Sequence, residues 1–520
     1  MSRKITVHLK PLDSAVELPA GASLADALVA FGVEFPCGGR GRCRGCRVRI
    51  IEGTLPPTKA DQAKLTAAEL AEGWRLVCQA HPESDLVLEL RQWSGLVLAD
   101  ETAFPFSPVE GLGVAVDVGT TTVVAQLLDL TNGRILGTET SINPQARFGA
   151  DVMSRISVGT QPGGRERLTS AIRDAVAGMV GRLVHRAPAG PPGTGETSPG
   201  GSRAGEPVRR AAIVGNTAMH HLFLGFDVAP LASYPFRTPK LGGEWFKGAE
   251  VGWKGVAAEA AACFLPNLGG FVGSDILGGI LATRIHESPS FTGSADLGTN
   301  GEIVFGGAAG MVVTSTAAGP AFEGARISQG MRAARGAIDR VTCEDGRLSA
   351  HVIGGAAPKG LCGSGLVDAV ACGLSTGAIA PSGRMAAGEM HIAGPVALRQ
   401  ADVRELQLAK GAIAAGLHIL MAQSGKSVKD IGTFFLAGAF GNSLDVASAR
   451  RIGLLPFPLD TVKPVGNAAL LGAKLALFAP DGGAPLFDSV VSKVRHVSLE
   501  QDPEFQDLFA ELMAFPPAGA

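Results

Sequence analysis

The chain has 520 residues, with 46 Lys and Arg against 48 Asp and Glu, so its formal net charge at pH 7 is −2. This balance lacks the positive charge that sequence-independent nucleic-acid binding needs, and one Tyr and four Trp are too few for a base-stacking surface. The 71 Gly are about twice the usual share and follow no collagen-like period. We therefore expect an α/β protein of several domains, rich in tight turns, that binds no nucleic acid.

Neither a targeting segment nor a membrane span is expected. The N-terminal residues alternate like a strand and lack the apolar core of a signal peptide. The longest apolar run near the end, Gly411 to Ala422, is shorter than the ~20 residues of a membrane-spanning helix. Four of the eight Cys lie in the first 80 residues, which indicates metal binding in a reducing compartment. We predict a cytoplasmic protein without a membrane partner.

The first 95 residues are predicted to form a domain of their own. In chain order we expect strands at 5–9 and 15–18, a helix at 23–31 capped by Ser23, and strands at 47–51 and 86–90. This order is that of an α+β domain of the β-grasp type. Residues 96–111, which include Pro105 and Pro108, lose the periodicity and are predicted to be a linker.

Residues 112–520 have a Gly-rich α/β pattern. The stretch at about 187–207 is dominated by Gly, Pro, Ser and Thr, so we expect a disordered surface insertion there. Residues 402–425 are the clearest helix, because apolar residues recur at helical spacing. Asp402 is predicted to cap this helix and Gly425 to end it.

Four cysteines in the first domain have the pattern of an iron–sulfur site. Cys37, Cys43 and Cys46 give Cys-x5-Cys-x2-Cys, and Cys78 supplies a fourth thiol after 31 intervening residues. A cluster needs four converging thiolates, and the glycines around them allow the loop to curl tightly. Backbone N–H groups and five arginines between residues 40 and 49 would offset the cluster's negative charge. We predict a 2Fe–2S cluster, with a spacing that resembles the adrenodoxin-like ferredoxins.

Alternatives stay open for these residues. A structural zinc site usually pairs two Cys-x2-Cys knuckles, of which the sequence has one. The arginines could form a solvated loop or a docking surface for an acidic partner. Trp74 is predicted to pack rather than to relay electrons. The remaining cysteines have no ligand spacing and are predicted to be buried small hydrophobic residues: Cys263, Cys343, Cys362 and Cys372.

A strand, a tight Asp-x-Gly-Thr turn and a second strand occur twice in the larger part of the chain. The copies contain Asp117 and Asp296 and are about one subdomain apart. Two such turns, one on each lobe, would clamp nucleotide phosphates with backbone N–H groups and Thr hydroxyls, while each Asp holds Mg²⁺ directly or through water. The turn residues predicted to bind the nucleotide are Gly119, Thr120, Thr121, Gly298, Thr299 and Asn300.

A third element, residues 435–442, is an apolar strand followed by Gly438 and Gly441, which are predicted to let the backbone approach an adenosine. With the two turns it resembles the superfamily of actin, sugar kinases and heat-shock chaperone ATPases. The resemblance implies an α/β, two-lobed, ribonuclease H-like ATPase domain over residues 112–520, with ATP and Mg²⁺ as ligands. Asp117, Asp296 and Glu302 are the expected catalytic residues. Glu302 and Glu323 would orient a hydrolytic water or bond to the phosphate turns.

Further motifs narrow the resemblance. They are Asn143-Pro144-Gln145, Gly149-Ala150-Asp151-Val152, Val214-Gly215-Asn216-Thr217-Ala218-Met219-His220, the turn at 296–302, Ala317 to Ala325, and Leu361-Cys362-Gly363-Ser364-Gly365. In this order, after a ferredoxin domain, they make nearly the whole chain similar to the reductive activators of corrinoid proteins. The resemblance adds Gly363 and Gly365 to the nucleotide-binding residues. His220 and His221 are predicted to be core residues rather than cobalt ligands.

This family implies the ATP-dependent return of an inactive Co(II) corrinoid to Co(I), with one electron passing through the 2Fe–2S cluster. The implied partners are the corrinoid protein of a methyltransferase system and a separate electron donor, a ferredoxin or a reductase, and a homodimer is compatible with it. Larger members carry an extra middle domain between ferredoxin and ATPase, where this chain has only a linker, so we expect that domain to be missing. No Cys follows Cys372, which excludes the members with C-terminal 4Fe–4S motifs.

Three other functions stay open at this point. A small-molecule kinase on the same fold would have no use for a ferredoxin domain. An activator of another low-potential enzyme, as in the acyl-CoA dehydratase activators, would hold a 4Fe–4S cluster between subunits instead of four Cys in one domain. A redox- or nucleotide-sensing protein would bind ATP without turnover, whichever partner is present.

Overall fold

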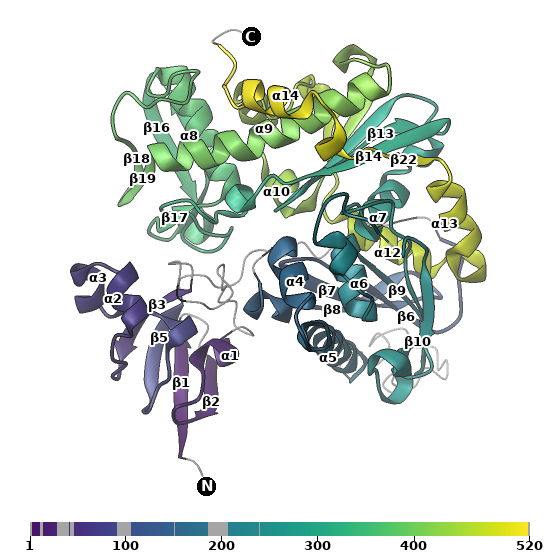
Figure 1. Ribbon diagram of the computed structural model, residues 1–520, viewed down its shortest axis with the longest axis horizontal. Helices are drawn as coiled ribbons and strands as arrows, with labels where there is room; N and C mark the ends of the chain where they lie inside the picture. Colours follow the sequence, from purple (N-terminus) through teal and green to yellow (C-terminus); the bar gives the residue numbers. More distant parts are fainter. Residues whose placement is uncertain are drawn as a thin grey trace, which may run out of the picture.

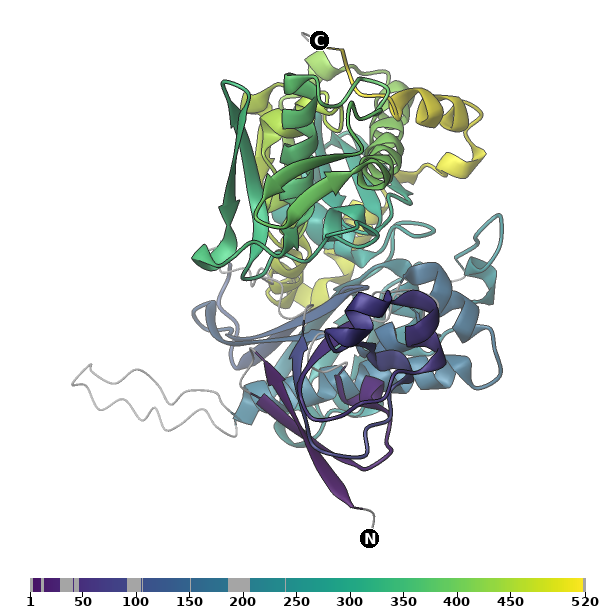
Figure 2. The ribbon, with the colours of Figure 1, turned by 90° about the vertical axis from the view of Figure 1, so that its left-hand side faces the viewer.

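The computed structural model of the chain describes residues 3–10, 14–28, 41, 46–90, 104, 106–149, 151–185, 206–238 and 240–517. They form a small N-terminal unit and a larger body of two lobes (Figures 1 and 2). Cys37 and Cys43, most of the predicted linker and nearly all of the predicted insertion lie outside these residues. Within the described residues, no helix is long and apolar enough to cross a membrane.

The N-terminal unit is a five-stranded sheet with short helices. Its elements are β1 (Lys4–Lys10), β2 (Ser14–Pro19), α1 (Leu24–Leu28), β3 (Arg47–Glu52), α2 (Lys59–Lys64), α3 (Ala67–Ala71), β4 (Trp74–Leu76) and β5 (Leu86–Leu90). The strand order is β2-β1-β5-β3-β4, with β1 antiparallel to β2 and parallel to β5, as in a β-grasp fold. Ile5, Val7 and Leu9 alternate along β1 and are buried in this unit's own core.

All four strands predicted in this unit are confirmed, and the predicted helix is confirmed over Leu24–Leu28. The sequence prediction lacked β4 and the helices α2 and α3. Both helices begin with a capping box, in which Thr58 pairs with Asp61 and Thr66 pairs with Glu69. This spacing of Thr and a carboxylate was the available signal for them, although each helix is too short to show an apolar period.

The first lobe contains a six-stranded sheet in the order β10-β11-β9-β6-β7-β8. Its elements are β6 (Leu112–Val118), β7 (Thr122–Asp129), β8 (Arg134–Ile142), α4 (Val152–Gly159), α5 (Gly164–His185), β9 (Val208–Gly215), α6 (Thr217–Leu224), β10 (Glu244–Lys247) and β11 (Ala261–Phe264). Val114 and Val116 of β6 face a core shared with α4, α5 and α6, whereas Ala115 faces the second lobe. The predicted linker ends against this body, since the rings of Phe104 and Phe106 lie 5.5 and 4.8 Å from that of Phe478.

The second lobe contains another six-stranded sheet, β21-β20-β12-β13-β14-β22, with smaller sheets beside it. Its strands are β12 (Thr292–Leu297), β13 (Gly301–Gly307), β14 (Gly310–Thr316), β15 (Ala337–Glu344), β16 (Arg347–Val352), β17 (Gly360–Leu361), β18 (Glu389–Ala393), β19 (Val396–Arg399), β20 (Thr433–Ala437), β21 (Val462–Pro464) and β22 (Val494–His496). The helices after the first lobe's sheet are α7 (Ser274–Thr283), α8 (Gly363–Thr376), α9 (Gln400–Gln423), α10 (Gly438–Ser443), α11 (Val446–Arg451), α12 (Ala468–Leu477), α13 (Ala484–Val491) and α14 (Phe505–Leu512).

The two large sheets repeat one topology, and each contains one copy of the duplicated Asp-x-Gly-Thr turn. In each sheet three antiparallel strands (β6-β7-β8 and β12-β13-β14) continue into parallel strands on the side of the first strand (β9 and β11, then β20 and β21). This arrangement places both Asp-x-Gly-Thr turns at equivalent ends of their sheets. The predicted two-lobed α/β architecture is confirmed.

The long helix α9 departs from the prediction at its start. It begins at Gln400, and Asp402 lies inside its first turn. The Asp402 carboxylate accepts the backbone N–H of Arg399 (2.9 Å) and the N–H and hydroxyl of Ser328 (2.6 and 2.7 Å). Asp402 therefore completes the start of the helix from its third position and ties it to a distant loop, which corrects its assignment as the cap. Gly425, with φ +62°, follows the end of the helix as predicted.

Helices α7 and α12 cross between the two large sheets and share one core with both. The crossing depends on glycine, because a Cβ at Gly472 would lie 2.1 Å from the carbonyl oxygen of Gly278 and 2.2 Å from its Cα. The backbones of the two helices are thus in direct contact at the centre of the body. This contact sets how closely the two helices approach each other between the sheets.

We expect Gly472→Ala to lower the stability of the body by about 1–3 kcal/mol, because the added methyl group meets backbone and not a flexible side chain. The measurement is the urea midpoint of unfolding, followed by circular dichroism. Gly181→Ala in α5 is the matched control, since a Cβ there meets nothing within 4 Å. That variant is expected to be unchanged or up to about 1 kcal/mol more stable, from helix propensity. Equal midpoints for the two variants would contradict the tight crossing.

Candidate functional site

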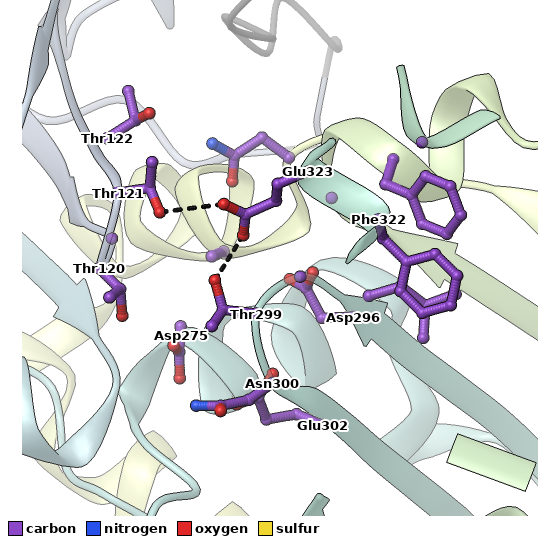
Figure 3. A pocket seen from close by; sticks show the side chains of 18 of the residues that line it. Thr120, Thr121, Thr122, Asp275, Asp296, Thr299, Asn300, Glu302, Phe322 and Glu323 are labelled. Carbon is purple, nitrogen blue, oxygen red and sulfur yellow. Dashed lines mark hydrogen bonds between the residues drawn. The ribbon is translucent and has the colours of Figure 1, made fainter. Parts of the chain in front are cut away.

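A cleft of about 350 Å³ lies between the two lobes, and both Asp-x-Gly-Thr turns open into it (Figure 3). The first turn follows β6 and the second follows β12. The residues that the sequence predicted and that line the cleft are Asp117, Gly119, Thr120, Thr121, Asp296, Gly298, Thr299, Asn300, Glu302, Gly363 and Gly438. The structure therefore brings the two copies of the repeat together, as a phosphate clamp requires.

Glu323 connects the two turns. Its carboxylate accepts one hydrogen bond from the hydroxyl of Thr299 (2.6 Å) and one from that of Thr121 (3.3 Å) (Figure 3). Glu323 ends the 3₁₀ helix η8 (Pro320–Glu323), which is held to the second turn by the N–H of Gly319 donating to the carbonyl of Thr299 (2.9 Å). Of the two roles considered for Glu323, the structure contains the hydrogen bonds to the phosphate turns.

Several helices begin at the cleft and direct their N-termini toward it. Asn216 caps α6 and donates its amide to the hydroxyl of Thr120 (2.8 Å). Asn467 caps α12 and donates to Oδ2 of Asp117 (3.0 Å). Helix α7 places Asp275 in its first turn, and α8 starts at Gly363. The unpaired N–H groups and dipoles of these ends favour an anion in the cleft, as a nucleotide phosphate would be.

Four carboxylates line the cleft, with Glu302 buried and Asp117, Asp275 and Asp296 partly buried, and their pKa values are raised. Burial raises the pKa of Asp296 to about 6. Burial and the charge of Asp296 raise the pKa of Asp117 to about 7, against the opposing effect of the Asn467 amide. Burial, Asp117 and Asp296 raise the pKa of Asp275 to about 8. Burial followed by the charges of Asp275 and Asp296 raises the pKa of Glu302 well above its usual value. This cluster lacks positive charge.

The cleft fits a phosphate-bound cation better than a metal held by protein alone. Among the lining residues that the structure describes, Arg332 is the single cation against five carboxylates. No three His, Cys, Asp or Glu side chains in the described part of the chain are arranged to hold a metal together. Mg²⁺ often takes one or two carboxylates and completes its shell with water and substrate phosphates. Asp117, Asp275 and Asp296 suit that mode of binding.

The raised pKa values predict that the affinity of the cleft for Mg·ATP and its affinity for ATP without Mg²⁺ change in opposite directions with pH. The folded protein holds protons on Asp296, Asp117 and Asp275 up to pKa values of about 6, 7 and 8, so the empty protein loses stability as pH rises from about 4 through 8. Each proton lost from these carboxylates adds a negative charge to the cleft. This charge strengthens the binding of a divalent cation and weakens the binding of a polyphosphate without a cation. We expect Mg·ATP to bind more tightly at pH 8 than at pH 6, and ATP with EDTA to bind less tightly. Calorimetric titration at both pH values measures this, and parallel trends would contradict it.

The other end of the cleft is apolar. The rings of Phe322 and Phe440 stack with centroids 4.5 Å apart, next to Gly363 at the start of α8. Gly438 has φ +81°, and a Cβ there would meet Oδ1 of Asp296 at 2.5 Å, so only glycine fits between the apolar end and the acidic cluster. A flat aromatic base suits this end, where we expect the adenosine of the nucleotide.

Two predicted nucleotide-binding glycines do not line the cleft. A Cβ at Gly365 would meet the carbonyl oxygen of Ile338 at 2.1 Å, so this residue lets α8 pack on β15. A Cβ at Gly441 would lie 3.2 Å from the Cβ of Leu436, so this residue lets α10 fold back on β20. Their assignment as nucleotide contacts is corrected, because close approach of backbone elements produces the same glycine pattern as close approach of a ligand.

Sequence reasoning missed several residues of the cleft. Asp275 follows Gly273-Ser274 at a helix start, a pattern common enough to carry no specific signal. Asn467 and Arg332 stand outside any motif noted in the sequence, and Cys362 was assigned to the core although it lines the cleft. These residues reach the cleft from segments far apart in the chain. Only the folded topology brings them to the turns.

The N-terminal unit brings the two described cysteines of the predicted cluster together. Cys46 precedes β3 and Cys78 follows β4, and the N–H of Val77 donates to the carbonyl of Cys46 (3.2 Å) across this antiparallel pair. A hydrogen bond from the Cys46 side chain lowers the pKa of Cys78 to about 7, assisted by the backbone N–H of Gly41 and opposed by burial. Adjacent thiols with an N–H donor fit a 2Fe–2S cluster, for which Cys37 and Cys43 would supply the other two ligands.

Two of the five arginines near this loop do not serve the predicted purpose. Arg47 pairs with Glu69 (3.1 Å), and Arg49 pairs with Glu89 (3.0 Å). Their charges are compensated within the unit, so they offset little of a cluster's charge and add little to a basic docking surface. Trp74 packs beside the guanidinium of Arg47, whose carbon lies 5.5 Å from the ring centre, in agreement with a packing role.

The residues assigned to the core are mostly found there. Cys263, Cys362 and Cys372 are buried, and burial raises the pKa of each thiol, whereas Cys343 is only partly buried. His220 and His221 are fully buried in α6, and the ring of His220 lies edge-on to Phe264 at 4.8 Å. Burial lowers both pKa values, that of His220 to about 3. Neutral, enclosed imidazoles agree with a core role.

Comparisons with known protein families assign each part of the chain. Residues 7–83 match the 2Fe-2S iron-sulfur cluster binding domain, residues 112–288 match the RACo middle region, and residues 291–520 match the C-terminal domain of RACo, the ASKHA domain. The chain thus carries a 2Fe–2S domain and an ATP-binding domain of the actin and sugar-kinase type, as predicted. The expected absence of a middle domain is corrected, because the region of that name is present here as the first lobe.

Individual relatives agree with this assignment. The corrinoid activation enzyme RamQ of Eubacterium limosum is 34% identical over 427 residues, which are 76% of this chain and 69% of that protein. The [Co(II) methylated amine-specific corrinoid protein] reductase of Methanosarcina barkeri is 28% identical over 297 residues, 51% of this chain and 55% of that protein. A solved structure, a reductive activator for corrinoid, iron-sulfur protein, matches with a TM-score of 0.68 at 27% identity, over 99% of this chain and 98% of that one.

Proposed function

The chain belongs to the family of reductive activators of corrinoid proteins, and from this premise we propose that it returns the Co(II) form of a partner's corrinoid to Co(I) in an ATP-dependent reaction. One electron enters from a separate donor, a ferredoxin or a reductase, and leaves to the cobalt of the partner, which gains that electron and needs no proton. The observation that carries the proposal is the presence, in one chain, of a 2Fe–2S unit and a nucleotide cleft built from both lobes.

The residues of the N-terminal unit hold the redox group. Cys46 and Cys78, with Cys37 and Cys43, would ligate the cluster, which when bound supplies one-electron transfer at low potential. The hydrogen bonds to Cys78 keep its thiol ionisable near neutral pH, so it is ready to act as a ligand. The four cysteines belong to one domain, and this argues against a cluster shared between subunits.

The residues of the cleft hold Mg·ATP. Thr121 and Thr299 would donate to phosphate oxygens, one from each lobe, and Asp117, Asp275 and Asp296 would neutralise a Mg²⁺ bound to those phosphates. Binding therefore draws the lobes together around the nucleotide. Plant-type 2Fe–2S centres lie near about −400 mV, and each 100 mV of uphill transfer costs about 2.3 kcal/mol per electron. ATP helps only if a closed body binds the Co(II) partner differently from an open one.

The test is optical and uses the anaerobically purified holoprotein with a low-potential reductant and a Co(II) corrinoid protein. The Co(I) absorption band is followed with and without ATP. Co(I) that forms only with ATP supports the proposal. If Co(I) forms at equal rates with and without ATP, the protein acts only as an electron donor, and a nucleotide-sensing role is favoured. ATP hydrolysis without any Co(I), across several corrinoid proteins, would direct the search to another low-potential acceptor.

A further inference from the structure

The carboxylate of Glu323 lies between the two turns of the phosphate clamp. One oxygen accepts the Thr299 hydroxyl at 2.6 Å and the other accepts the Thr121 hydroxyl at 3.3 Å (Figure 3). These two hydroxyls come from different lobes and are the ones that a nucleotide phosphate would use. A carboxylate resembles a phosphate edge, since it presents two anionic oxygens that accept hydrogen bonds side by side.

We propose that Glu323 is a positioning residue that holds the place of a nucleotide phosphate, keeps the two turns aligned while the cleft is empty, and is displaced when ATP binds. The segment that carries it is suited to such a change. Gly319 and Gly324 flank η8 with φ of +80° and +74°. A Cβ at Gly319 would meet nothing within 4 Å, whereas one at Gly324 would lie 2.3 Å from the carbonyl oxygen of Met331, so the segment is open at its start and anchored at its end. Phe322 precedes Glu323 and stacks on Phe440, so movement of the segment also reaches the apolar end of the cleft.

Because both are negatively charged, the Glu323 carboxylate and a nucleotide phosphate cannot occupy the site between the two hydroxyls together. Glu323 adds a negative group to a cleft that already contains Asp117, Asp275, Asp296 and Glu302. A phosphate placed between the same two hydroxyls would therefore lose their hydrogen bonds and face like charge as well. Removing the charge at this position should strengthen binding in proportion to the number of phosphates, because adenosine alone does not reach the turns.

The experiment compares adenosine, ADP and ATP, each with Mg²⁺, by calorimetric titration of wild type, Glu323→Gln and Glu323→Ala. Glutamine keeps the shape and the hydrogen-bonding capacity of the Glu323 side chain without its charge. We expect ATP to bind about tenfold more tightly to Glu323→Gln, with a smaller gain for ADP and none for adenosine. Glu259→Gln is the matched control, since Glu259 is an exposed surface residue paired with Lys247, and all three of its affinities are expected to stay unchanged.

Each outcome decides the inference. ATP affinity that is unchanged or weaker in Glu323→Gln would overturn it, and a weaker affinity would make Glu323 a contact of the bound nucleotide. A loss of adenosine affinity as well would indicate that the substitution disturbs the fold. The unfolding midpoint of Glu323→Ala then shows whether the fold is disturbed or whether the phosphate site has only lost the Glu323 carboxylate. The inference rests on the proposed function. If wild type binds no ATP, the proposed function fails, whereas equal binding by wild type and Glu323→Gln removes this inference alone.

A second, independent feature lies beside the cysteines of the N-terminal unit. Asp61 of α2 is 1% exposed. Its carboxylate accepts the N–H and hydroxyl of Thr58 (2.7 and 2.8 Å) and the N–H of Leu76 (2.6 Å). Leu76 is two residues from Cys78, and the charge of Asp61 acts on that thiol. Within the described residues, no Lys, Arg or His forms an ion pair with Asp61.

We infer that Asp61 lowers the reduction potential of the cluster held by these cysteines, because a fixed negative charge in a buried position opposes the arrival of an electron. Three neutral donors hold the carboxylate in place without cancelling its charge. A low potential is what a donor to Co(II) needs. The inference therefore bears on the proposed function, but its test depends only on the cluster.

The test is a spectroelectrochemical titration of the holoprotein and its variants, with cluster content checked by visible absorbance. We expect the potential of Asp61→Asn to be more positive than that of wild type. Asp85→Asn is the matched control, because Asp85 also accepts a backbone N–H, from Thr6 at 2.8 Å, but is exposed, and its potential is expected to stay unchanged. Asp61→Ser is a second neutral variant in case the first takes up no cluster. Potentials equal to or below that of wild type in the neutral variants that load, or failure of both to load, would overturn the inference.

Discussion

Replacing Cys78 by serine is expected to abolish Co(I) formation, a loss of at least about a hundredfold, while ATP hydrolysis by the body persists. The thiolate is the ligand form of cysteine, and the lowered pKa of about 7 makes it available at neutral pH. A serine hydroxyl does not ionise there. The visible absorbance of the cluster, the rate of ATP hydrolysis and the Co(I) band are measured on the same anaerobic preparation.

The control for this variant is Cys343→Ser. Cys343 lies in β15 of the second lobe, is partly buried and is not part of the proposed cluster. It should retain the cluster and the full Co(I) signal. If Cys78→Ser keeps a normal 2Fe–2S spectrum, Cys78 is not a ligand, and the proposed ligand set is wrong at this position.

Replacing Asp296 by asparagine is expected to separate electron transfer from ATP. Asp296 is the penultimate residue of β12, faces Glu302 in the strand register, and is partly buried with Asp117 and Asp275 nearby. Asparagine keeps the shape but cannot neutralise Mg²⁺, so we expect ATP hydrolysis to fall by about a hundredfold or more. Reduction of the cluster by a chemical donor should be unchanged, and the ATP-dependent part of Co(I) formation should vanish.

Stability distinguishes this result from misfolding. Removing one of several like charges that lie close together should leave the protein without nucleotide as stable as wild type, or more stable at pH 8, where Asp117 and part of the Asp275 population are ionised. Asp460→Asn, at an exposed position in a short 3₁₀ turn, is the matched control and should behave as wild type. Unchanged ATP-dependent reduction in Asp296→Asn would disprove the coupling of the cleft to electron transfer.

Local patterns in the sequence were sufficient for the domain types. The alternating runs around residues 5–9 and 86–90 and each Asp-x-Gly-Thr turn are confined to a few consecutive residues, and three of the four cluster cysteines lie within residues 37–46. Strand periodicity and turn chemistry act over this same range, so the sequence displays them directly. The duplicated turns also predicted one phosphate-binding turn on each lobe, and the structure has one copy in each large sheet.

The composition of the cleft was decided by the tertiary structure. Thr121 and Glu323 are 202 residues apart, and Asp117 and Asn467 are 350 residues apart, yet each pair shares a hydrogen bond. Asp275 enters the acidic cluster because α7 crosses α12 between the sheets. No periodicity or spacing encodes such meetings, since they depend on how whole elements pack.

The same distinction explains the glycines. In the sequence, Gly363, Gly365, Gly438 and Gly441 are equivalent signs of close approach. In the structure, Gly363 and Gly438 line the cleft, whereas Gly365 and Gly441 make room for neighbouring backbone. The sequence by itself determined that this protein joins a 2Fe–2S unit to a two-turn nucleotide domain. The tertiary structure decided which residues face the nucleotide, because that depends on which surface each element presents once the two lobes have packed.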